Sequence, residues 1–318
     1  MPYCAKCGAE LKEDDKFCSG CGTPVAVPVA EPERRVEREE KKPMSNLTIV
    51  LIVLVVVVVV VAVGVMALFW TLGGLWQGPW PAGQVVGSGK LVTEEMIYSD
   101  FTVVDVGNAF EVEITQSNSY SVSITADDNL FDYIQVSKTG ETLDIGLKWG
   151  YNYRSSTLRA EITMPELYEL RLSGATHGIV EGFSSSHKFI LDLSGASSLD
   201  IVDLSAGDIE FDISGASLVT GGIMASGDAQ FDVSGASRVD LKGAANDLLF
   251  DVSGASHLDL SNFPVHNADV ELDGASQATI NLDGKLDAEL SGSSHLYYRG
   301  DPTLGNIEAS SGSTVSKK

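Results

Sequence analysis

Cysteine and basic residues are scarce in this chain. The four cysteines among 318 residues all lie within the first 21 positions, which excludes a disulfide-stapled fold for the remainder. Lys and Arg total 21 against 44 Asp and Glu, giving a net charge of −23. A chain this acidic is poorly suited to binding a polyanion, so no nucleic-acid partner is expected.

Charge itself is missing from residues 47–89, which contain no Asp, Glu, Lys or Arg. Within this stretch, residues 47–70 form a predominantly apolar run of 24 residues that would span about 36 Å as a helix, enough to cross a bilayer. A core strand is the weaker interpretation, because buried strands run only about 4–8 residues. The sequence therefore predicts one transmembrane helix over 47–70, with the lipid bilayer as its partner.

The orientation of this helix follows from the basic residues on its two sides. Five of them precede the span closely, namely Arg34, Arg35, Arg38, Lys41 and Lys42, whereas the first one after it is Lys90. The positive-inside rule then predicts a single-pass membrane protein with a cytoplasmic N-terminus and an extracytoplasmic C-terminal domain, at the cell surface or in the periplasm. A cleaved signal peptide fits less well, since 46 residues are too long for its leading region.

The four cysteines form two CxxC pairs, Cys4/Cys7 and Cys18/Cys21, with ten residues between the pairs. This spacing lets four thiolates converge on one Zn²⁺, and a glycine follows each pair where a tight turn is needed. The expected cytoplasmic location argues against disulfides. Because four thiolates leave no open position, the zinc is predicted to be structural. Residues 3–24 resemble the zinc-ribbon modules of many prokaryotic membrane proteins, and a cytoplasmic protein is the expected partner of this ribbon.

A motif centred on glycine repeats through the C-terminal part with spacings of 18–21 residues. Its copies are LRLSGAT at Gly174, LDLSGAS at Gly195, FDISGAS at Gly215, FDVSGAS at Gly235, FDVSGAS at Gly254, VELDGAS at Gly274 and AELSGSS at Gly292, with a degenerate copy near Gly312. Each copy starts as an alternating strand and ends in a small-residue corner. The pattern predicts a parallel β-helix, a solenoid in which Phe211, Phe231 and Phe250 stack as an interior ladder.

Several segments together resemble a known family. These are FEVEITQSNSYSVSITADDN, TLDIGLK, ITMPELYELRLSGAT and the SGAS copies, and with them residues 98–316 are similar to the head GIN domain family of auto-transporter adhesins. The resemblance implies a right-handed β-helix on the cell surface or in the periplasm and an adhesin role. The chain departs from auto-transporters because no series of alternating membrane strands follows the repeats, so self-transport is not expected.

Two columns of side chains are predicted on the outside of the solenoid. The position three residues before each glycine holds Arg171, Asp192, Asp212, Asp232, Asp251, Glu271 and Glu289, and the position three residues after holds His177, Ser198, Leu218, Arg238, His257, Gln277 and His295. We favour the acidic column as a solvated face that discourages aggregation, with Ca²⁺ binding as the alternative. The histidines are expected to lie dispersed on the surface rather than to share a metal ion, since His257 and His295 would stand about 9.6 Å apart.

The remaining sequence signals concern aromatic residues and catalysis. Trp149, Tyr151 and Tyr153 are expected either to stack on sugar rings or to cap the solenoid. No GxSxG or HExxH motif occurs and no singular carboxylate pair stands out, so the protein is predicted not to be an enzyme, and no catalytic residue or organic cofactor is assigned.

The sequence thus predicts a mainly β protein with five parts. These are a zinc ribbon (1–24), a charged linker (25–46), the transmembrane helix (47–70), a juxtamembrane linker (71–97) and an extracytoplasmic β-helix (98–318). The expected function is adhesion, scaffolding or self-association in the cell envelope, with an envelope protein or glycan as the outer partner. A transmembrane sensor that signals through the ribbon is the alternative, and a glycan-active enzyme comes third.

Overall fold

The structure is a computed structural model that describes residues 3–4, 6–10, 17–22, 24 and 83–318. The chain divides into two compact units, Met1–Gln77 and Gly78–Lys318, which are described separately. The predicted transmembrane helix over 47–70 lies outside the described residues. None of the helices in the described ranges is long and apolar enough to span a membrane.

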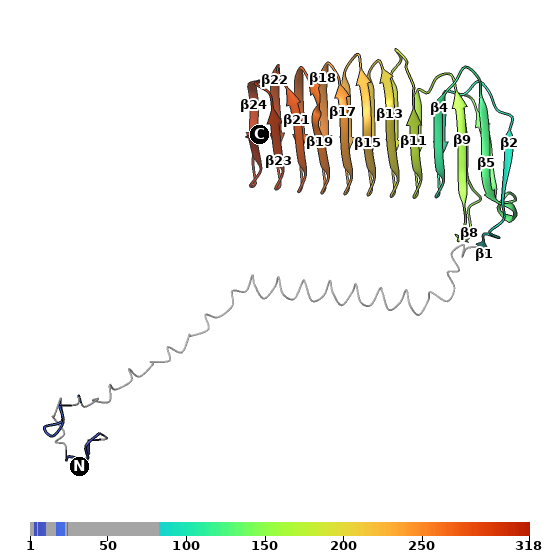
Figure 1. The fold of residues 1–318 in the computed structure, drawn as a ribbon. Helices are drawn as coiled ribbons and strands as arrows, with labels where there is room; N and C mark the ends of the chain where they lie inside the picture. The colour runs from blue at the N-terminus through green and yellow to red at the C-terminus, as the bar shows by residue number, and fades with distance from the viewer. Residues whose placement is uncertain (1–2, 5, 11–16, 23, 25–82) are drawn as a thin grey trace, which may run out of the picture. The chain divides into compact units, whose positions relative to one another are not determined.

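The second unit consists almost entirely of strands stacked in rows (Figure 1). The larger sheet contains, in spatial order, β2 (Leu91–Met96), β5 (Ser121–Asp127), β9 (Leu158–Met164), β4 (Glu111–Gln116), β11 (His177–Glu181), β13 (Ser198–Ala206), β15 (Leu218–Ala225), β17 (Arg238–Ala244), β19 (His257–Val265), β21 (Gln277–Leu282), β23 (His295–Arg299) and β25 (Thr314–Lys317). The second sheet contains β24 (Thr303–Ala309), β22 (Lys285–Leu290), β20 (Asn267–Leu272), β18 (Asp247–Val252), β16 (Ala229–Val233), β14 (Ile209–Ile213), β12 (Phe189–Leu193), β10 (Glu169–Leu172), β3 (Val103–Val106), β7 (Thr142–Leu147) and β6 (Ile134–Thr139). A small parallel pair, β1 (Gly83–Val86) with β8 (Tyr151–Arg154), and a short 3-10 helix η1 (Asp128–Leu130) complete the unit.

Each coil from β10 onward contributes one strand to each sheet and pairs in parallel with the coil before it. The register keeps equivalent positions of the repeat together, so that Phe211 pairs with Phe231, and Phe231 with Phe250. One sequence repeat of about 20 residues is therefore one coil. The prediction of a mainly β, parallel solenoid is confirmed.

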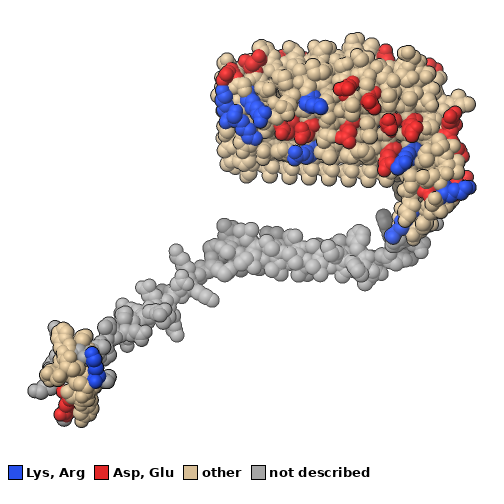
Figure 2. All heavy atoms as spheres, viewed as in Figure 1, with Lys and Arg blue, Asp and Glu red and all other residues tan. Residues whose placement is uncertain are grey.

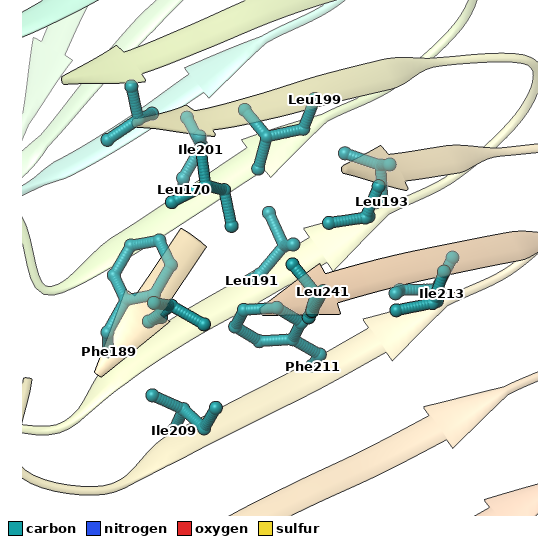
Figure 3. Close-up of a cluster of buried hydrophobic side chains, with 14 of the residues drawn as sticks. Leu170, Phe189, Leu191, Leu193, Leu199, Ile201, Ile209, Phe211, Ile213 and Leu241 are labelled. Carbon is teal, nitrogen blue, oxygen red and sulfur yellow. The ribbon is translucent and has the colours of Figure 1, made fainter. Parts of the chain in front are cut away.

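The core fills the space between the two sheets. Strand residues alternate between buried and exposed, as in β16, because successive side chains point to opposite faces of a strand. Phe211, Phe231 and Phe250 are each 1% exposed, which confirms the predicted ladder. Figure 3 shows how Phe211 lies among the leucine and isoleucine side chains of neighbouring coils. This continuous core belongs to the second unit alone, so residues 83–318 are expected to fold independently.

From β10 to β22, the corner after each strand of the second sheet depends on its glycine. The seven repeat glycines, from Gly174 to Gly292, have φ between 72° and 78°, which disfavours a side chain. A Cβ atom added at any of them would lie 2.2–2.5 Å from the carbonyl oxygen of the preceding corner. Two residues further on, at every one of these corners except that of Gly195, a buried Ser or Thr hydroxyl donates to the carbonyl three residues back, for example Ser237 to Ser234 at 2.9 Å. The SGAS motif is thus a stacking corner.

The first coil is separated from the second by an insertion. Strands β3 and β4 pair in parallel with β10 and β11, yet residues 117–168 intervene and form β5 to β9. In this first coil Asn108 takes the place of the corner glycine, with φ of 74°. The insertion contains the antiparallel pairs β5–β9 and β6–β7, which close this end of the solenoid.

The folded unit starts earlier than the sequence predicts. Residues 71–97 were expected to be a juxtamembrane linker, but β1 and β2 lie within them. Strand β2 pairs antiparallel with β5, and β1 pairs with β8, so both depend on partners from the insertion. The linker is therefore shorter than predicted by at least residues 83–97.

Candidate metal centre and the outer faces of the solenoid

The four cysteines lie together in the first unit. Each CxxC pair forms a turn in which a backbone N–H donates back to the first cysteine, from Gly8 to Cys4 (2.9 Å) and from Gly22 to Cys18 (2.8 Å). Both glycines have φ near 70°, as the sequence suggested. All four sulfur atoms lie within 4.8 Å of one another, the Sγ atoms of Cys4 and Cys21 being 3.7 Å apart and those of Cys7 and Cys18 3.6 Å apart. A tetrahedron with Zn–S bonds of about 2.3 Å has edges of about 3.8 Å, so the geometry fits a structural Zn²⁺.

The electrostatics of the four thiols also favour a bound cation. Backbone N–H groups, first that of Lys6, lower the pKa of Cys4. At Cys7 the backbone N–H of Ala9 acts in the same direction, but the sulfurs of Cys21 and Cys18 raise the pKa of this thiol to about 12. Four thiols this close cannot all ionise unless a cation neutralises them. A divalent metal supplies that charge.

The predicted acidic column is present on the second sheet. The strand register aligns Asp192, Asp212, Asp232, Asp251, Glu271 and Glu289 as direct neighbours. It also extends the column to Glu308 at one end and, beyond Arg171, to Asp105 and Asp144 at the other. A Ca²⁺ ion takes 6–8 oxygen ligands, and within the described residues no three of these carboxylates come close enough together to hold one ion. The arrangement favours a solvated face.

At neutral pH, repulsion within the acidic column slightly destabilises the folded state. Burial, and then the charge of Asp232, raise the pKa of both Asp212 and Asp251. Acidic side chains are not confined to this column, because on the face seen in Figure 2 carboxylates lie along the length of the solenoid with basic residues among them. The sharpest repulsion is nevertheless expected at Asp232, between two carboxylates of raised pKa.

Replacing Asp232 with asparagine is expected to stabilise residues 83–318 at pH 7 by about 0.5 kcal/mol or less, because the column is solvent-screened. A carboxylate whose pKa is raised in the folded state destabilises the fold while it is ionised. The stability gained by Asp232→Asn should therefore shrink as the pH falls through the raised pKa values of Asp212 and Asp251 toward 3.8. Urea midpoints at pH 7 and pH 3 measure this. Glu95→Gln, at an exposed position on β2, is the control. A gain that persists at pH 3 contradicts the explanation.

The histidine column is also present but does not form a metal site. Register places His177 beside Ser198 and His257 beside Gln277, and His295 follows Gln277. The Nδ1 atom of His177 lies 2.7 Å from the Ser198 hydroxyl, and burial together with Arg238 lowers the pKa of His257. Within the described residues, the cysteines are the one group of possible ligands close enough to hold an ion. The register thus separates His257 from His295 by two coils.

A second ladder of side chains, which the sequence analysis does not predict, lies at the start of the strands of the second sheet. The Oδ1 atom of Asp208 accepts from the backbone N–H of Asp228 (3.0 Å), that of Asp247 accepts from Asn267 (3.0 Å), and that of Asn267 accepts from Lys285 (2.9 Å). These residues border a shallow hollow of about 410 Å³. Asp or Asn at intervals of about 20 residues was the available signal. Each side chain ties one coil to the next, so the hollow is a by-product of stacking.

The aromatic residues of β8 and its preceding turn have two different roles. Tyr151 and Tyr153 pack against Tyr133, with ring centroids 4.9 and 6.1 Å apart, and the Tyr153 hydroxyl donates to the carbonyl of Lys148 (2.8 Å). These tyrosines are part of the closed end of the solenoid, which supports the capping interpretation for them. Trp149, in contrast, is 79% exposed.

Comparison with known proteins supports this architecture of a β-solenoid with a separate four-cysteine module. Residues 100–302 match the family described as "Putative auto-transporter adhesin, head GIN domain", and residues 3–25 match a zinc-ribbon domain. Because the first match spans more than half of the sequence, the chain belongs to the head GIN domain family. No match was found among curated proteins.

Solved structures show the same fold. A structure described as a putative adhesin from Parabacteroides distasonis is 18% identical with a TM-score of 0.67, and another so described, from Parabacteroides merdae, has the same values; each match covers 74% of this chain and 100% of the other. A structure described as a putative lipid binding protein from Parabacteroides distasonis is 22% identical with a TM-score of 0.65, covering 74% of this chain and 99% of the other. At these identities the likeness shows the fold.

Proposed function

We propose that this chain is a single-pass membrane protein that presents a rigid, right-handed β-helix outside the cytoplasm for adhesion, scaffolding or self-association. The observation that carries the proposal is the solenoid itself, a long continuous core with regular outward columns rather than a single deep site. Regular columns offer a repeated surface to a partner, which is what an adhesive or scaffolding module requires. Membership of an adhesin family and adhesin-described structural neighbours support this role over catalysis.

The anchor and orientation in this proposal come from the sequence. The uncharged stretch 47–70 supplies the membrane span, and the basic residues before it place the ribbon in the cytoplasm. The solenoid then faces an envelope protein or glycan, while the ribbon is available to a cytoplasmic protein. A structural Zn²⁺ held by Cys4, Cys7, Cys18 and Cys21 lets so small a module fold.

A second candidate function is envelope sensing. It is favoured by the presence of a folded module on each side of the predicted span, because an anchor alone needs no zinc ribbon. In this alternative the solenoid detects a state of the envelope and the ribbon passes it to a cytoplasmic partner.

Deleting residues 1–24 distinguishes the two functions. Cells that express the truncated chain are expected to attach to envelope-derived protein or glycan surfaces as well as cells with the full chain, because adhesion needs only the anchored solenoid. Cells that express a chain lacking residues 83–318 should lose attachment, and counting adherent cells after washing measures both. Sensing is supported instead if attachment never depends on the solenoid and an envelope-stress response disappears with residues 1–24.

A further inference from the structure

Trp149 is an exposed aromatic side chain that is not part of the hydrophobic core of the solenoid. It lies in the turn between β7 and β8, beside Gly150 with φ of 95°, and is 79% exposed. The neighbouring tyrosines are packed into the closed end of the solenoid, whereas this indole is presented to the surroundings. A large apolar side chain displayed on a turn is a candidate contact point with another phase or molecule.

The turn that carries Trp149 lies where the chain enters the solenoid unit. Strand β1 pairs in parallel with β8, and its first residue, Gly83, is the register partner of Tyr151. Only 12 residues separate Gly83 from Trp70, the last residue of the apolar stretch. Twelve residues reach at most about 43 Å when fully extended, so an anchor at 47–70 limits this turn to about that distance from the end of the span and lets it reach the bilayer surface.

The charge of the turn also differs from that of the rest of the unit. Residues 148–154 contain Lys148 and Arg154 and no acidic residue, although residues 90–318 carry 35 acidic and 13 basic side chains. Figure 2 shows basic side chains, with acidic ones beside them, at the end of the unit where Figure 1 labels β1 and β8. Tryptophan prefers the headgroup level of a membrane, and basic side chains beside it can pair with lipid phosphates there.

We propose that the segment Lys148–Arg154, which comprises this turn and β8, contacts the membrane, with the Trp149 indole in the headgroup region and the exposed Arg154 facing lipid phosphates. The Lys148 ammonium donates to the backbone carbonyl of Asp132 (2.6 Å) and adds positive charge beside them. This inference rests on the proposed membrane anchor. The indole gains apolar surroundings for its ring while its N–H keeps a polar partner, which explains why tryptophan prefers this depth. The contact fixes one end of the solenoid at the bilayer, in addition to the covalent connection through β1.

Brominated lipids test the contact directly, since they quench tryptophan only at close range. The full chain is prepared with Trp70, Trp76 and Trp80 replaced by phenylalanine, which leaves Trp149 as its single tryptophan. It is reconstituted into vesicles of phosphatidylcholine and phosphatidylglycerol (about 3:1), with or without bromine on the upper part of the acyl chains. Trp149 emission is expected to fall at least about twofold in the brominated vesicles and to lie at shorter wavelength than in a detergent-free solution of residues 83–318.

The control places the single tryptophan elsewhere on the unit. Leu304, which is 50% exposed on the edge strand β24, is replaced by tryptophan in a chain that also carries Trp149→Phe, and this reporter is expected to show no quenching. Trp149 emission that bromine does not change overturns the inference, as does quenching by soluble cell-wall glycans alone, which would assign the indole to sugar stacking. Alkaline carbonate extraction separates the two failures: loss of the chain from the vesicles rejects the anchor and the contact together, whereas retention without quenching rejects only the contact.

Discussion

Replacing Gly235 with alanine is expected to destabilise the solenoid by about 3–5 kcal/mol and to lower its melting temperature by roughly 10 °C. Two effects add at this position. The φ of 78° is unfavourable for any residue with a Cβ atom, and the new Cβ would lie 2.3 Å from the carbonyl oxygen of Gly215. That oxygen also accepts from the N–H of Ala236, so it cannot move away without breaking the corner ladder. Thermal unfolding of residues 83–318 measures the loss.

Gly140→Ala is the matched control for this substitution. Gly140 has a comparable φ of 63°, but a Cβ atom there meets no atom within 4 Å. Its replacement should therefore lower the free energy of unfolding by only about 1 kcal/mol, the contribution of the positive φ alone. Equal losses at Gly140 and Gly235 would show that close stacking of the corners contributes nothing to stability, which contradicts the role of the SGAS motif as a stacking corner.

Replacing Cys18 with serine is expected to abolish zinc binding and with it the fold of the ribbon. Cys18 is 2% exposed, and its removal leaves three thiolates for a metal whose binding free energy, about 10–16 kcal/mol in small zinc modules, is the folding free energy of the module. The purified full chain should hold one zinc per molecule and the variant close to none. Metal analysis gives the stoichiometry, and the absorption of the Co²⁺-substituted protein reports a four-thiolate tetrahedral site.

Ser19→Ala is the control for the zinc experiment, because Ser19 lies between Cys18 and Cys21, is exposed and carries no ligand atom. It should bind one zinc as the unaltered chain does. The melting temperature of the solenoid should be the same in all three proteins, since the two units have separate cores. Stoichiometric zinc in the Cys18→Ser chain would rule out the four-cysteine site.

The repeated part of the fold was predictable from the sequence because one physical requirement recurs in each coil. A corner that stacks at strand spacing needs glycine, and an interior ladder needs an apolar residue at a fixed offset, so Gly235 and Phe231 predict both the period and the register. The degenerate last copy keeps the register, since Glu308 aligns with Glu289, but departs from the rule at its corner, where Ser311 stands at the glycine position with φ of 55°. The four zinc ligands were predictable for a similar reason, their spacing.

The closed end of the solenoid was not predictable in the same way. Residues 117–168 interrupt the repeat after its first coil, so the coil that contains Asn108 has no neighbour in sequence from which its period can be read. Asparagine is among the few residues other than glycine that accept a positive φ, and only the structure shows that it stands at a corner. Strands β1 and β2 fall within the predicted linker 71–97, because their partners, β8 and β5, lie in that insertion and give the sequence no local strand signal there. Strand pairing between segments that are distant in the chain leaves little signal in the local sequence pattern.

The position of the insertion determines how the length of this protein can change. The antiparallel cap and the entry of the chain share one end of the unit, whereas successive coils are added in sequence away from it. Gain or loss of one 20-residue repeat would alter the reach of the solenoid by about 4.8 Å and leave the cap, the entry strand and the Trp149 turn untouched. The length of the solenoid can therefore change in steps of one coil, while the end that carries the cap and the entering chain stays the same.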